Sequence, residues 1–139
     1  MIRFPAQDSK ENCLAAFWRW IAILEADDYD GAVDALYWDK PTSWTGAILK
    51  ERITTFFGGD DPWFVVVPNE RLIGVINDAC EYATLQTNDR SGWFMAQIPL
   101  TTKPNDPKDD EIPLMGLASS FFVREIDGQY VMEHEIFHV

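Results

Sequence analysis

Cysteine, histidine and basic residues are all scarce in this chain of 139 residues. It has two Cys, two His and 11 Lys or Arg against 23 Asp or Glu, which gives a formal net charge of −12. Cys13 and Cys80 form no C-x-x-C pair, so we interpret both as small buried hydrophobic residues rather than reactive thiols. Phosphate contacts need clustered Lys and Arg, which are missing, and this argues against a nucleic-acid-binding surface.

Long apolar runs and common catalytic motifs are also missing. No apolar run approaches the ~20 residues that a membrane-spanning helix needs, and Met1 to Lys10 contains no signal-like apolar segment. We therefore expect a cytoplasmic protein. No G-x-S-x-G motif or phosphate-binding loop is present, and none of the serines is expected at a strand-to-helix elbow: Ser9, Ser43, Ser91, Ser119 and Ser120. No cofactor is expected.

Aromatic residues, by contrast, are plentiful. Hydrophobic residues make up 47% of the chain and aromatic residues 14%, with six Trp and nine Phe. A chain of this length is expected to fold as one domain, residues 1–139, and to bury about two-thirds of its unfolded surface. The aromatic content suits a fold that must fill, or partly line, a large concave space.

Helical periodicity is concentrated in the first part of the chain. Asp8 or Ser9 can cap a helix that is apolar nearly all round from Cys13 to Leu24, as buried helices are. Asp27-Asp28 opens a short helix, and a third helix starts at Pro41-Thr42-Ser43 and stops at Gly58-Gly59. We expect the helices within residues 9–57, with several buried contacts: Phe17, Trp18, Ile21, Leu36 and Ile53.

Strand patterns follow, and they predict a sheet drawn from residues 63–139. The expected segments begin with Trp63 to Val67 and a long strand within Leu72 to Thr87, on which Asp78, Cys80 and Tyr82 would share one face. A polar connection from Thr101 to Pro113 lacks the ligand spacing and central Gly of a calcium loop, so we interpret it as a solvated connection. Its acidic residues are Asp106, Asp109, Asp110 and Glu111.

The chain ends in a literal H-E-x-x-H, which marks zinc proteases only when it lies on a helix. Here an Asp127-Gly128 turn between two β-rich runs predicts a hairpin whose second strand continues through this motif. On a strand, residues four apart are roughly 13 Å apart, too far to share zinc at about 2.0–2.1 Å. We therefore expect no metal site at His134 and His138.

Alternation along this last strand predicts which side chains face the helices. The inward set is Tyr130, Met132, His134, Ile136 and His138, and the outward set is Val131, Glu133, Glu135, Phe137 and Val139. Glu133 and Glu135 either solubilise the sheet or mark a face that recognises a basic partner.

Two segments carry a family resemblance. Residues 24–37, LEADDYDGAVDALY, and residues 121–131, FFVREIDGQYV, resemble the first helix junction and the last hairpin of the nuclear transport factor 2-like superfamily, which includes ketosteroid isomerase and scytalone dehydratase. The resemblance implies an α+β cone: three N-terminal helices packed on one face of a strongly curved antiparallel sheet, with an interior pocket. It also implies a frequent homodimer through the outer sheet face. The superfamily hosts enzymes, ligand binders and interaction proteins, including immunity proteins that neutralise bacterial toxins.

Two functions follow as alternatives. An isomerase or dehydratase would need an acid–base pair inside the cone, and the residues we expect around the pocket are Trp18, Tyr37, Asp78, Tyr82 and His134. No local motif matches the isomerase's catalytic positions, so we predict no catalytic residues. The favoured function is a non-catalytic binding module, either an immunity-type inhibitor of a basic toxin or a carrier of a small apolar ligand. An open cavity that holds an acid–base pair would favour the enzyme instead.

Overall fold

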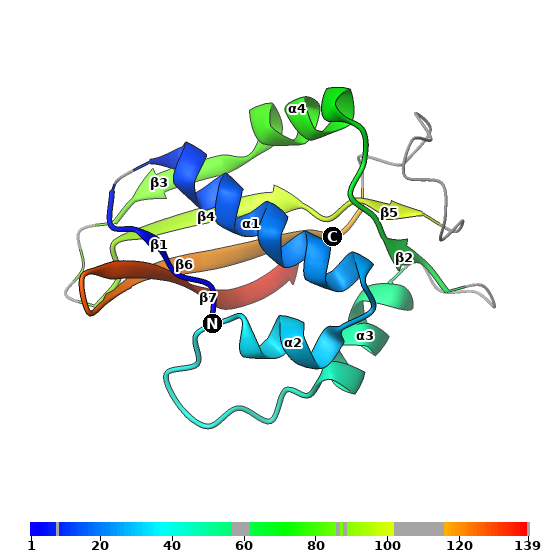
Figure 1. The fold of residues 1–139 in the computed structure, drawn as a ribbon, viewed down its shortest axis with the longest axis horizontal. Coiled ribbons are helices and arrows are strands. Elements are labelled where there is room, and N and C mark those ends of the chain that lie inside the picture. Colours follow the sequence, from blue (N-terminus) through cyan, green and yellow to red (C-terminus); the bar gives the residue numbers. More distant parts are fainter. Residues whose placement is uncertain (8, 57–61, 86, 88, 102–115, 139) are drawn as a thin grey trace.

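A computed structural model describes residues 1–7, 9–56, 62–85, 87, 89–101 and 116–138. These residues form an α+β fold in which helices pack on a strongly curled antiparallel sheet (Figure 1). No helix in the described ranges combines the length and the apolar character needed to cross a bilayer. The expected helix stop at Gly58-Gly59 and the acidic connection after Thr101 lie outside the described residues.

Three helices lie within residues 9–57, but the third begins at Gly46 and not at Pro41-Thr42-Ser43, and a fourth helix follows outside that range. Each of the first three begins at a capping side chain. Helix α1, Lys10–Glu25, is capped by Ser9, whose Oγ accepts the backbone N–H of Asn12 at 3.3 Å. Helix α2, Tyr29–Asp34, and helix α3, Gly46–Thr54, are capped in the same way by Asp28 and Thr45. These caps satisfy backbone donors that a helix leaves unpaired at its start.

A fourth helix, α4, spans Glu70–Ala79, where the sequence pattern had suggested a strand. The prediction of a strand from Leu72 was therefore wrong, and β3 covers only Glu81–Thr84. Asn69 caps α4 by accepting the backbone N–H of Leu72 at 2.9 Å, and Leu72 and Ile76, four residues apart, are the buried positions. Pro68-Asn69, directly after the expected segment Trp63 to Val67, is the helix start, so Asp78 lies on a helix and not beside Tyr82 on a strand.

The main sheet has the strand order β1-β7-β6-β4-β3, with all neighbours antiparallel. Besides β3, its strands are β1 (Phe4–Pro5), β4 (Gly92–Gln97), β6 (Ala118–Ile126) and β7 (Gln129–His138). Two short strands, β2 (Phe64–Val65) and β5 (Leu100–Thr101), pair separately. The sheet thus also uses Phe4–Pro5, which lies outside the expected range 63–139. Figure 1 shows α1 lying across the sheet, with α4 on one side of α1 and α2 and α3 on the other side.

The terminal hairpin forms as predicted. Asp127 and Gly128 have φ angles of 52° and 80°, and positive φ at both central residues is the signature of a type I′ turn. The H-E-x-x-H segment lies entirely in β7, which confirms that it is a strand. The absence of zinc binding remains a prediction.

A bulge changes which side chains of β7 face the helices. Ser120 pairs with Ile136, but the next residue, Phe121, pairs with His134, so Glu135 is the extra residue. Strict alternation was therefore wrong beyond this point. Ile136 is 52% exposed, whereas Phe137 packs near Trp44, with ring centroids 6.1 Å apart.

The concave side of the sheet is filled with aromatic rings. Phe121 lies with its ring centroid 5.0 Å from that of Phe94, 5.3 Å from Trp20 and 6.3 Å from Phe17. All four rings have 0% exposure. Where an interior pocket was expected, the described interior is packed. Of the five residues expected to be buried, Phe17, Ile21, Leu36 and Ile53 are buried, while Trp18 is only partly buried.

Candidate functional site

The structure distributes the five expected pocket residues over separate surface depressions. Trp18 and Asp78 line a groove between α1 and α4. Tyr37 lines a hollow beside the β6–β7 turn, and His134 lines a third depression next to the loop of residues 38–44. Tyr82 packs against the core and lines none of these three. The expected residues therefore do not surround one common cavity.

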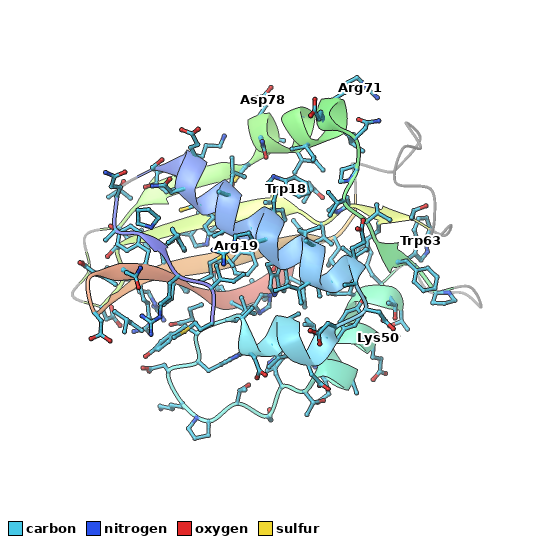
Figure 2. The ribbon with its side chains drawn as sticks, in the orientation of Figure 1. Trp18, Arg19, Lys50, Trp63, Arg71 and Asp78 are labelled. Atoms are coloured by element: carbon cyan, nitrogen blue, oxygen red, sulfur yellow. The ribbon has the colours of Figure 1, made fainter. Side chains whose placement is uncertain are left out.

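The α1–α4 groove brings two of the five together. The indole Nε1–H of Trp18 donates to Asn77 Oδ1 at 2.7 Å, which ties α1 to α4. Figure 2 shows Asp78 on the outer side of α4, pointing away from the sheet, and its side chain is exposed. An exposed carboxylate of this kind lacks the desolvated surroundings that tune a general base.

The outer face of the sheet carries a charged cluster that sequence reasoning did not find. Arg124 donates from Nε to Glu133, and Arg90 Nη2 lies 3.3 Å from the same carboxylate. The side chains of Arg124 and Glu133 are only 12% and 14% exposed. The hydrogen bond to Glu133 raises the pKa of Arg124 above its ordinary value. Glu133, considered for a partner-facing role, is thus engaged within the fold.

A second cluster on this face contains Ser120, Glu135 and His138. The Ser120 Oγ, fully buried, lies 2.8 Å from His138 Nε2 and donates to Glu135 Oε2 at 2.9 Å. Trp93 Nε1–H donates to the same carboxylate oxygen at 2.7 Å. In a catalytic triad with a serine nucleophile, the carboxylate orients the histidine. Here the Glu135 carboxylate accepts a hydrogen bond from the Ser120 hydroxyl instead. The cluster therefore does not have the arrangement of a hydrolase site.

His134 faces the opposite side of β7 from His138. Its ring centroid lies 4.6 Å from that of Phe137 and 5.6 Å from those of both Trp44 and Phe121. Burial lowers the pKa of His134 to about 4, against a smaller raising effect of Glu135. The ring is thus neutral at neutral pH, and its buried Nε2 has no hydrogen-bond partner among the described residues.

The two histidines of the H-E-x-x-H therefore cannot share a metal in this conformation, because the bulge places them on opposite faces. In the part of the chain that the structure describes, no group of three or more His, Cys, Asp or Glu is arranged to hold a metal ion.

The fold and these surfaces define an α+β protein with a packed concave side and polar clusters on its outer face. Comparison with models of protein families, with curated proteins and with solved structures gave no match.

Proposed function

We propose that this chain is a non-catalytic binding module of the nuclear transport factor 2-like type, which recognises a basic protein in the way that immunity proteins bind bacterial toxins. The observation that carries the proposal is the aromatic filling of the concave side, where Phe17, Trp20, Phe94 and Phe121 are fully buried. An isomerase or dehydratase of this fold would use that space for its substrate and its acid–base pair.

The same filling disfavours a carrier of small apolar ligands. Such sites are concave, mostly apolar and enclose most of the ligand. The depressions lined by Tyr37 and by His134 lie at the surface and are edged by charged side chains, among them Asp89 and Asp39. A protein partner needs no interior cavity, so a packed interior is compatible with an interaction role.

The negative charge of the chain favours a basic protein as the partner. The net charge of −12 creates a negative field around the molecule. Such a field speeds encounter with a basic protein and suppresses encounter with acidic ones, and its effect falls with added salt. The outer sheet face is the surface that we propose for self-association, because Ile136 is 52% exposed there.

Partner capture from the source cell, at low and at high salt, tests this function. We expect a basic protein to be recovered whose association rate falls steeply with salt, and no small molecule in native mass spectra of the purified chain. Isomerase turnover, or a stoichiometric apolar ligand without any protein partner, would reject the proposal. Size-exclusion chromatography of wild type and of Ile136→Lys tests the dimer, which should dissociate in the variant.

A further inference from the structure

We propose that the depression between the 38–44 loop and β7 binds one arginine side chain of the partner protein. We call it the loop pocket; it has a volume of about 390 Å³ and is lined by Trp38, Asp39, Lys40, Pro41, Thr42, Ser43, Trp44, Glu133 and His134. The inference rests on the proposed function in taking the partner to be basic, and it adds the group that is recognised. Three features of the pocket support it.

The first feature is a pair of indole rings suited to a planar cation. Trp38 and Trp44 stack with centroids 6.2 Å apart and an interplanar angle of 28°. The Nε1–H of Trp38 donates to the Val33 carbonyl at 3.0 Å, which fixes that ring. The chain's own Arg52 already lies over Trp44, with Cζ 5.3 Å from the ring centroid. Indole faces attract guanidinium groups, and Arg52 already makes this kind of contact with one of the two indole rings that line the pocket.

The second feature is a histidine ring nitrogen in the pocket wall that has no hydrogen-bond partner among the described residues. His134 lines the pocket, and its Nε2 is buried without a partner among the described residues. A buried polar atom left unpaired destabilises the structure that holds it. Because the ring stays neutral at neutral pH, one ring nitrogen is an acceptor. An arginine side chain offers several N–H donors in a fixed plane, so one of them can satisfy this atom while the plane contacts Trp38.

The third feature is the charge at the rim. Glu133 is already paired with Arg90 and Arg124. Asp39, whose charge also acts on Arg124, is the exposed pocket carboxylate that can meet an incoming cation. Asp39 is exposed and accepts only the Tyr37 hydroxyl at 3.3 Å among the hydrogen bonds seen in the described residues. A carboxylate can take a guanidinium through two parallel hydrogen bonds.

The direct test uses arginine as a small probe. N-acetyl-arginine amide is titrated into ¹⁵N-labelled full-length protein while the indole N–H signals are followed, with the neutral isostere N-acetyl-citrulline amide and N-acetyl-lysine amide in parallel. We expect saturable shifts of the Trp38 signal with a Kd of order mM, as befits a single side chain, and binding at least fivefold weaker for lysine. Citrulline should not bind detectably.

Two variants and a matched control locate the site. Asp39→Asn removes the rim carboxylate and His134→Phe removes the acceptor while keeping an aromatic ring; each should weaken arginine binding about three- to tenfold. Asp34→Asn, an exposed position on α2, makes the same charge change outside the pocket and should leave binding unaltered. Absence of saturation at about 20 mM arginine, equal citrulline binding, or equal weakening by Asp34→Asn would overturn the inference.

The proposal and the proposed function can fail separately. If arginine does not bind but a basic protein is captured, the partner uses another surface and the loop pocket is rejected. If arginine binds with the expected variant pattern but the protein proves to be an enzyme, the pocket stands and the binding-module function is rejected.

Discussion

Phe121→Ala offers the sharpest test of the claim that the concave side is packed. The ring is fully buried and contacts Phe17, Trp20, Phe94 and the His134 ring. Large-to-small core changes of this kind cost about 3–5 kcal/mol, because a cavity remains after the ring is removed. With about 4 °C of Tm per kcal/mol for a domain of this size, we expect Tm to fall by roughly 12–20 °C.

The cavity should then bind a small apolar molecule. Apolar cavities of about 150 Å³ remain dry and take up benzene, and a ligand at about ten times its Kd stabilises the folded state by roughly 1.4 kcal/mol. Benzene should therefore raise the Tm of Phe121→Ala by about 5 °C. It should not change the Tm of the wild type, whose concave side is filled by buried aromatic rings. If Phe121→Ala does not fold, Phe121→Leu gives a smaller cavity and a milder version of the same test.

Phe122→Ala is the matched control, one residue further along β6 and on its outer face. Phe122 is partly buried and lies under Arg90, whose Cζ is 3.9 Å from its ring centroid. Its removal should cost about 1–2 kcal/mol through lost contact and cation–π attraction, and it should create no site for benzene. Calorimetry with and without benzene measures the Tm of the wild type, Phe121→Ala and Phe122→Ala. A benzene-dependent Tm rise in the wild type would refute the packed interior and revive the enzyme or carrier function.

Three further predictions concern β7. The pKa of about 4 for His134 lies below the ordinary 6.5, so the unfolded chain takes up a proton before the folded chain does as the pH falls. Between about pH 6.5 and 4, the wild type should therefore lose up to about 3 kcal/mol more unfolding free energy than His134→Phe. Urea titration at each pH measures this difference. Glu133→Gln leaves two guanidinium groups without their carboxylate and should cost about 3 kcal/mol, against about 1 kcal/mol for Glu135→Gln, whose partners are neutral. Metal-free protein should bind no stoichiometric zinc; about one equivalent lost on His134→Ala would contradict the strand argument.

Local signals in the sequence predicted local structure well. The Asp127-Gly128 turn, the helix start at Asp8 or Ser9 and the helix start at Asp27-Asp28 depend on residues within three or four positions of one another, so they can be predicted from the chain directly. The fourth helix was not predicted because its local signals are ambiguous. Pro68-Asn69 can end a strand or start a helix, and the short apolar run that follows fits either element. The spacing of Leu72 and Ile76 was the available clue.

Contacts between distant residues could not be predicted in this way. Arg90 and Glu133 are 43 residues apart, and Trp93 and Glu135 are 42 apart. Their pairing depends on the register of three neighbouring strands, and register follows from packing of the whole sheet. The outer-face clusters therefore become visible only in the structure.

The bulge at Glu135 decides which face of β7 each histidine occupies. Under strict alternation, His134 and His138 would lie on the same side of β7 and Phe137 on the other. The extra residue leaves His134 against Trp44, and both line the loop pocket, while Phe137 turns toward the same rings. It also sends His138 to the outer face, where it meets Ser120. A single inserted residue thus separates the two histidines of the H-E-x-x-H motif and places them on opposite faces of β7.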